Sequence, residues 1–209
     1  MIDPARSTVV AWYDVLPDDL AELVARLQAA AVACLGTACR LRHPDQVHAT
    51  LIGLERTPAP FDPAPLAAHL RAALTPPLTI QFGGFPRDDR RLLSRGTTLY
   101  DRGVTVRDGR VVLMGWPVAD GVPGAELARI RESCAAHGVT HRYGFDPDVY
   151  LVLADVAPGA QAEELEAAVR RELAGTAVRL PLGASDLSLV TYDDTTLPRS
   201  STVWEPLSS

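Results

Sequence analysis

The order of predicted strands and helices repeats along the chain, and this repeat constrains the fold more than any other feature. Segment 8–13 is rich in β-branched and aromatic residues and indicates a strand, while apolar residues recur at helical spacing over 17–33. A mostly buried strand at 47–54, a helix at 62–74 and a strand at 78–82 follow. The first half is therefore predicted to be β-α-β-α-β.

The second half shows the same order at an offset of roughly 100 residues, which is the pattern of an internal duplication. The predicted counterparts are strand 111–116, helix 124–137, strand 148–156, helix 160–174 and strand 176–182. The two halves share this pattern and negligible sequence identity. We predict one α+β domain of two pseudo-symmetric lobes, about 1–103 and 104–192, with antiparallel or mixed sheets, helices on the outside and a tail at 193–209.

Local signals mark several boundaries. Asp62-Pro63 combines an N-cap residue with proline at the first helical position, which predicts a helix start. Asp108-Gly109 predicts a hairpin turn between strands at 104–106 and 111–116. A last strand is expected from Leu187 to Tyr192. Residues 85–98 are read as a polar, arginine-rich connection.

Composition excludes some classes of protein. With 209 residues, of which 47% are hydrophobic and 22% charged, the chain can bury a core and is too apolar to be disordered. The formal charge of −6 excludes a generally basic surface that coats nucleic acid, but it allows a local basic patch. The N-terminus lacks the pattern of a signal peptide, and no apolar run approaches the roughly 20 residues of a membrane span. We expect a cytoplasmic monomer without membrane contact.

The cysteines bear on metal binding and on the compartment. Cys34, Cys39 and Cys134 are an odd number in a chain of ordinary size, which argues against a disulfide framework and agrees with a reducing compartment. A zinc site formed by Cys34, Cys39 and His43 is an alternative to free thiols, although its spacing is uncommon and it lacks an evident fourth ligand. We expect no metal and no cofactor.

His48 and Thr50 are the first candidate site residues. Side chains at i and i+2 of a strand point to the same face, so these two project together from an apolar segment. A buried imidazole and hydroxyl need polar partners, and a groove with a polar ligand supplies them. A histidine satisfied within the core, beside a strand-favouring threonine, is the structural alternative.

The stretch that contains this pair resembles a known family. Gln46-Val47-His48-Ala49-Thr50-Leu51-Ile52-Gly53-Leu54-Glu55, preceded by a strand, an amphipathic helix and a polar loop, resembles the first motif of the two-histidine (2H) phosphoesterases. That family includes 2′-5′ RNA ligase-like proteins and cyclic nucleotide phosphodiesterases, and its two lobes each supply a His-x-Thr/Ser motif to a central groove. The resemblance implies that His48 acts as acid or base and Thr50 binds phosphate, without metal, on a nucleotide or RNA end with a cyclic or open phosphate.

The second motif departs from the family pattern. In Phe145-Asp146-Pro147-Asp148-Val149-Tyr150, Asp148 stands in place of histidine and Tyr150 in place of threonine or serine. Tyr150 can still donate to a phosphate oxygen. A carboxylate repels a phosphodiester, and with an ordinary pKa near 4 it is a poor proton donor at pH 7, although it could serve as a base with His48 as acid.

Other residues are candidates to complete the site. His141, in the loop before the second motif, could supply the missing imidazole, and Arg142 and Tyr143 could contact a ligand for the same reason. Seven arginines stand between 87 and 110 against four aspartates, and Arg95 is the one we assign to the substrate. A solvated hairpin surface is the alternative for this segment.

Three functions remain open from the sequence. The first is a divergent phosphoesterase that hydrolyses a cyclic phosphate or phosphodiester by metal-independent acid/base catalysis. The second is a non-catalytic protein that binds a nucleotide or RNA end in the same groove, and the third is an interaction protein whose groove is vestigial. ATP- or NAD-driven chemistry is not supported, because the sequence has no glycine-rich phosphate loop.

Overall fold

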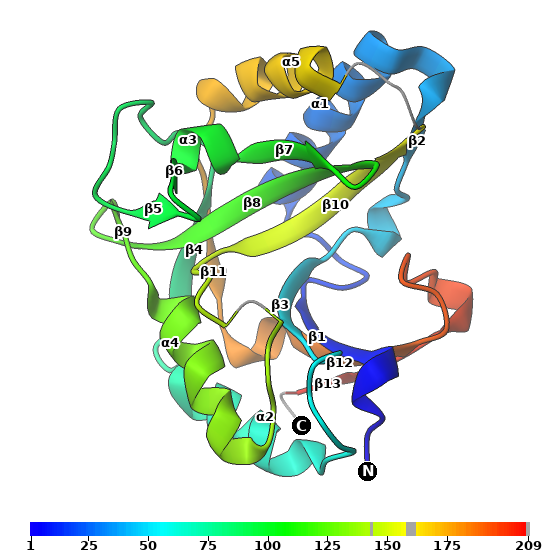
Figure 1. Ribbon diagram of the computed structural model, residues 1–209, viewed down its shortest axis with the longest axis vertical. Coiled ribbons are helices and arrows are strands. Elements are labelled where there is room, and N and C mark those ends of the chain that lie inside the picture. The colour runs from blue at the N-terminus through cyan, green and yellow to red at the C-terminus, as the bar shows by residue number, and fades with distance from the viewer. Residues whose placement is uncertain (143, 158–161, 208–209) are drawn as a thin grey trace.

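The structure is a computed structural model that describes residues 1–142, 144–157 and 162–207 (Figure 1). Its main sheet has the order β11-β4-β8-β10-β3-β1-β12-β13, and all of its strand pairs are antiparallel. These eight strands are β1 (Ser7–Ala11), β3 (Ala49–Gly53), β4 (Leu78–Phe82), β8 (Arg110–Ala119), β10 (Val149–Val156), β11 (Val178–Leu182), β12 (Leu187–Tyr192) and β13 (Thr202–Pro206).

Shorter strands and the helices complete the fold. The strands β2 (Cys39–Leu41), β7 (Val104–Arg107) and β9 (Val122–Pro123) extend the main sheet, and β5 (Leu93–Ser94) pairs with β6 (Thr97–Thr98). The helices are α1 (Asp18–Leu35), α2 (Pro63–Ala73), α3 (Leu99–Arg102), α4 (Glu126–Ser133) and α5 (Ala162–Ala174). The predicted α+β class with a large antiparallel sheet is confirmed.

Two of the predicted local signals are visible as structure. The Asp62 carboxylate accepts a hydrogen bond of 3.0 Å from the backbone N–H of Ala64 and so caps α2. Asp108 and Gly109 have φ angles of 51° and 70°, as the tight turn between β7 and β8 requires. Both signals act within a few residues, which is why they could be read from the sequence.

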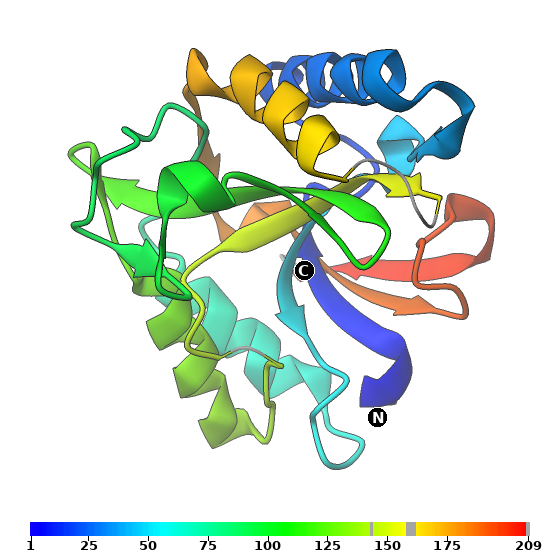
Figure 2. The same cartoon turned by 45° about the horizontal axis from the view of Figure 1, so that its top comes forward.

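One face of the sheet carries the main core. Alternate strand residues such as Val9, Leu51 and Leu151 point to this face, where they join apolar residues of α1, α2, α4 and α5 in a single cluster. Figure 2 shows α1 beside α5 and α2 beside α4. The opposite face of the sheet is therefore free of these four helices and available for a site.

The predicted boundary between the two halves of the chain does not coincide with a boundary in the sheet. β4, from the first half of the chain, pairs with β8 and β11, and β12, from the second half, pairs with β1. Each half of the chain thus contributes strands to both sides of the sheet. A boundary near residue 103 separates the predicted series of elements, but it does not separate the sheet.

The C-terminal segment corrects a prediction. Residues 193–209 were expected to be a tail, but Thr202–Pro206 forms β13 and pairs with β12 along its length. Trp204 packs edge-on against Tyr13, with 6.2 Å between ring centroids. Thr202, Val203 and Trp204 are residue types that favour strands, and pairing with β12 holds this part of a mostly polar segment in that conformation.

The first helix also departs from expectation. The helical stretch Asp18–Ala38 is long and apolar enough to cross a membrane by length and composition, whereas the sequence was read as having no such run. Leu20, Leu23 and Leu27 of this helix pack in the core. A core helix meets the same criteria as a membrane span, so this is weak evidence for a span, and the cytoplasmic location stays a prediction.

Candidate ligand-binding groove

A groove lies on the face of the sheet opposite the four long helices. Two small apolar clusters flank it, one that includes Met114 and Trp116 and one that includes Val10, Tyr13 and Val190. The central strands β3 and β10 run between these clusters. The middle of this face is therefore lined by polar side chains instead of a continuous apolar layer.

The floor of the groove is made by Thr50 and Tyr150. These two residues form the register pair between β3 and β10, so their side chains leave the sheet on the same face. The Tyr150 hydroxyl and the Thr50 side chain form a hydrogen bond. Burial raises the pKa of Tyr150, while the bond to Thr50 opposes that change, so the phenol stays protonated at neutral pH. The structure thus brings both predicted hydroxyls together.

His48 lies on the same face, two residues before Thr50. Its Nδ1 is 2.7 Å from the carbonyl oxygen of Gln46, and because a carbonyl can only accept, Nδ1 carries the proton. In the neutral ring Nε2 is then a proton acceptor. Burial lowers the pKa of His48 to about 4, the bond to Gln46 opposes this, and the charge of Arg42 lowers the pKa further. His48 is therefore neutral at pH 7 and its Nε2 can accept a proton, but a pKa of about 4 makes it a weak base.

Arg42 is a site residue that the sequence analysis missed. It is 8% exposed, and its guanidinium lies 2.7 Å from the Asp155 carboxylate. It lines a cavity of about 330 Å³ together with His48, Thr50 and Tyr150. Arg42 directly follows the short strand β2, which the sequence analysis does not predict. Without that strand, nothing in the sequence indicates that Arg42 lies near His48.

Asp148 does not face His48 as a second catalytic group would. Its Oδ2 is 3.0 Å from the Arg102 guanidinium and accepts a hydrogen bond of 3.2 Å from the Ser94 hydroxyl. Burial raises the pKa of Asp148, and Arg102 and Arg131 oppose this. The carboxylate is thus buried and held in an ion pair with an arginine of the 87–110 segment.

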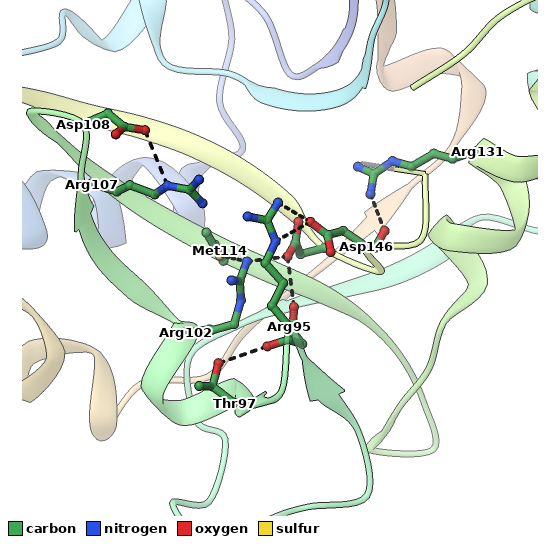
Figure 3. A network of polar contacts seen from close by, with 10 residues as sticks. Arg95, Thr97, Arg102, Arg107, Asp108, Met114, Arg131 and Asp146 are labelled. Carbon is green, nitrogen blue, oxygen red and sulfur yellow. Dashed lines mark hydrogen bonds and ion pairs between the residues drawn. The ribbon is translucent and has the colours of Figure 1, made fainter. Parts of the chain in front are cut away.

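Asp146, the other carboxylate of the second motif, is held in the same way. The Arg95 Nε lies 2.8 Å from Asp146 Oδ2, and the Asp146 carbonyl accepts a bond of 2.6 Å from Arg131 (Figure 3). Arg95, which was assigned to the substrate, therefore contacts a carboxylate of the protein, and it also lines a second cavity. The arginine-rich segment closes over the second motif instead of forming only a solvated surface.

His141 occupies a different place from the one proposed for it. Its Nδ1 accepts a hydrogen bond of 2.9 Å from the backbone N–H of Gly53. Gly53 is five residues from His48 along β3, which corresponds to roughly 16 Å of extended chain. Burial lowers the pKa of His141 to about 3, and the charge of Arg131 adds to this. The imidazole is neutral and fixed at the far end of the strand.

The second cavity adjoins the first. It has a volume of about 180 Å³, and Arg110, Arg142, Tyr150 and Val152 line both cavities. Arg142, which was predicted to contact a ligand, is exposed, with its guanidinium 3.8 Å from the Glu55 carboxylate. Tyr143, the remaining predicted contact, lies outside the described residues.

The described part of the chain contains no group of three or more His, Cys, Asp or Glu residues that could hold a metal ion. This includes the alternative zinc site. Cys39 is buried, Cys34 is partly buried, and the His43 ring is bonded to Asp45 at 2.6 Å. The cavity at His48 thus offers hydroxyls, arginines and the neutral imidazole of His48 to a ligand, beside the carboxylate of Glu55.

Comparison with known proteins identifies a solved structure with a similar fold and gives no information on function. No family model matches the chain, and no curated protein sequence matches it. Among solved structures, TT0787 of Thermus thermophilus is similar, with a TM-score of 0.52 and 18% sequence identity over 96% of this chain and 93% of that chain. At this identity, the likeness shows a shared fold over nearly the whole of both chains.

Proposed function

We propose that this chain binds a nucleotide or an RNA end through its phosphate, in the groove above Thr50 and Tyr150, on a divergent 2H phosphoesterase frame. In this proposal the frame is two equivalent halves of the sheet, β11-β4-β8-β10 and β3-β1-β12-β13, which meet at the Thr50–Tyr150 pair. The order of the strands and the single register pair between the halves support it. The His48 motif and the Asp148 motif then belong to opposite halves.

The charge of the groove supports an anionic ligand. Six arginines line the two cavities against four carboxylates, in a protein whose formal charge is −6. A local positive balance of this kind attracts phosphate groups, and arginine forks match phosphate oxygens. The lining residues concerned are Arg42, Arg95, Arg102, Arg107, Arg110 and Arg142, with Glu55, Asp108, Asp146 and Asp148.

The single observation that favours binding over ordinary two-histidine catalysis is the ion pair of Asp148 with Arg102. Two-histidine chemistry needs a second proton donor or acceptor at this position. A carboxylate held at 3.0 Å from a guanidinium is neither an available acid nor an imidazole. The loss of one positioned acid or base typically lowers a rate by about 10²- to 10⁴-fold.

A second function, slow hydrolysis with His48 as the base, is favoured by one specific observation. The bond from Nδ1 to the Gln46 carbonyl orients the ring and makes Nε2 the basic atom. His48 could then activate a water or a ribose hydroxyl, while Thr50 and Tyr150 donate to the phosphate oxygens. Without a matched acid, we expect such turnover to be slow.

The test is a panel of ligands without added metal: inorganic phosphate, 5′-mononucleotides, 2′,3′-cyclic nucleotides and short RNAs with cyclic ends. Thermal stabilisation and calorimetry measure binding, and chromatography measures turnover. We expect nucleotides to bind to the wild type and Thr50→Val to weaken binding. Thr79→Val is the matched control, because Thr79 is an exposed strand residue that lines neither cavity.

Two outcomes would contradict the proposal. If no phosphate-bearing ligand stabilises the wild type, the groove is not a phosphate site. If the wild type turns over a cyclic phosphate rapidly and His48→Ala abolishes it, the chain is an enzyme that finds its acid elsewhere, and the assignment of binding as the main function fails.

A further inference from the structure

The two adjoining cavities differ in the number of carboxylates among their described lining residues, one in the first and three in the second. The cavity at His48 contains Arg42, Arg110 and Arg142 with one carboxylate, Glu55. It also contains the hydroxyls of Thr50 and Tyr150. Asp155, which lines neither cavity, lies 2.7 Å from Arg42 and 4.0 Å from Arg110, so three arginines stand against two carboxylates here. The remaining positive charge and the hydroxyl groups suit an anion.

The described lining of the second cavity contains five arginines and three aspartates, but two of the arginines, Arg110 and Arg142, are shared with the first cavity. The charge of the other three is compensated within the cavity. Three of its arginines each form an ion pair with an aspartate that lines the same cavity: Arg95 with Asp146, Arg102 with Asp148, and Arg107 with Asp108. His141, which also lines it, is uncharged at neutral pH because burial lowers its pKa to about 3. These carboxylates would repel a phosphate placed among them.

Apolar side chains form part of the wall of the second cavity. Val112, Met114 and Val152 contribute to its lining, and Met114 belongs to the small apolar cluster beside Trp116. A polarisable thioether and branched aliphatic groups make favourable contacts with flat rings. The cavity therefore suits an uncharged planar group better than an anion.

We infer that the second cavity is a binding site for an uncharged planar ring, and that one ligand spans both cavities, with its phosphate beside His48 and its ring beyond Tyr150. This inference rests on the proposed function and adds the orientation and the chemical class of the ligand. The ligand is a phosphate ester of a ring-bearing compound of nucleotide size, bound lengthwise across Tyr150. The residues around Asp148 then form the binding site for the ring. Because the carboxylates there disfavour phosphate, the phosphate end of the ligand lies at His48 and the ring end lies in the second cavity.

Thr105 offers a way to fill the second cavity alone. It lies on β7, is partly buried and lines the second cavity but not the first. Its hydroxyl is buried without a hydrogen-bond partner, so a larger apolar side chain replaces no bond. Thr105→Phe should occupy the space of the ring, and Thr105→Leu should do so in part, which keeps the test usable if the larger variant does not fold. Thr79→Phe adds the same ring at an exposed strand position that lines neither cavity.

The experiment is calorimetry with inorganic phosphate, ribose 5-phosphate and adenosine 5′-monophosphate. For the wild type we expect the nucleotide to bind at least about tenfold more tightly than ribose 5-phosphate, which corresponds to about 1.4 kcal/mol. Thr105→Phe should remove this advantage and leave the affinity for inorganic phosphate unchanged, Thr105→Leu should reduce it, and Thr79→Phe should behave as the wild type.

The possible failures are distinguishable. Equal affinity of the wild type for ribose 5-phosphate and the nucleotide would overturn the ring site while leaving the phosphate site intact. Equal weakening of phosphate and nucleotide by Thr105→Phe, or no effect on either, would also overturn it. No binding of any of the three ligands to the wild type would refute the proposed function, and the ring site with it.

Discussion

Replacing Asp148 by asparagine preserves the shape of the side chain and removes the negative charge that faces Arg102. The two side chains are 7% and 11% exposed, and their charged atoms are 3.0 Å apart. At an effective dielectric constant of about 20, two unit charges at that distance attract with roughly 5 kcal/mol. Removing one partner of a buried pair typically costs about 3–5 kcal/mol, because the other charge is left buried and uncompensated.

We expect Asp148→Asn to fall at the lower end of that range, because the amide oxygen can still accept the Ser94 hydroxyl bond and because burial, which raises the pKa of Asp148, already disfavours the charge that is removed. A loss of about 3 kcal/mol corresponds to a decrease in Tm of roughly 6–12 °C for a domain of this size. Arg102→Met should be destabilising as well, since it leaves the Asp148 carboxylate without its partner. The double variant should lose less than the sum of the single variants, with a coupling energy of about 1–3 kcal/mol.

The assay is urea unfolding at pH 7, followed by circular dichroism, for the wild type, both single variants and the double variant. Asp108→Asn is the matched control, because Asp108 pairs with Arg107 at the surface, with side-chain exposures of 85% and 52%, and should leave stability unchanged. A change below about 0.5 kcal/mol for Asp148→Asn would refute the structural role of this carboxylate. Loss of turnover at unchanged stability would instead identify Asp148 as a catalytic group.

The two histidines described above, and Gly115 in the middle of β8, give further tests. The pKa of His141 is about 3 in the folded chain, so only the unfolded chain takes up a proton at this residue as the pH falls below about 6.5. Between pH 7 and pH 5, the free energy of unfolding of the wild type, measured with urea, should therefore fall by about 2 kcal/mol more than that of His141→Gln. A bound anion should raise the pKa of His48 from about 4, so calorimetry should show a 2′,3′-cyclic nucleotide binding more tightly at pH 5 than at pH 7, and His48→Gln should flatten this dependence. Gly115→Ala should destabilise by about 1–3 kcal/mol in thermal unfolding, because its Cβ would lie 2.5 Å from the Phe82 ring, whereas Gly175→Ala has nothing within 4 Å and should be neutral or stabilising.

Elements with a strong local signal could be predicted from the sequence. The apolar spacing of α1, the Asp62 cap of α2 and the turn at Asp108 all depend on residues close together in the chain. The short strand β2 could not be predicted, because it is held mainly by its neighbour β10, and β13 was missed although Thr202, Val203 and Trp204 favour a strand. Propensity is a weak guide for a strand as short as β2, since pairing decides its conformation.

The same distinction applies to the groove. The period of two along a strand predicts that His48 and Thr50 share one face, and both line the same cavity as Tyr150, the register partner of Thr50. The ion pair of Arg102 with Asp148 joins residues 46 positions apart, and no local pattern links them. The role of Arg42 likewise depends on a contact with Asp155, 113 positions away. Long-range pairs of this kind decide the chemistry of the groove, and they are set by the tertiary fold.

The placement of β12 beside β1 has a consequence for the order of events during synthesis. β1 leaves the ribosome before β12 (Leu187–Tyr192), one of its two neighbours, and most of the described strands and helices lie between the two in the chain. A nascent chain that ends before residue 187 therefore presents β1 with an unpaired edge, which is the kind of surface that invites aggregation. Pairing across so long a separation also slows folding. Cells that make this protein thus have to protect an incomplete sheet until β12 has been made.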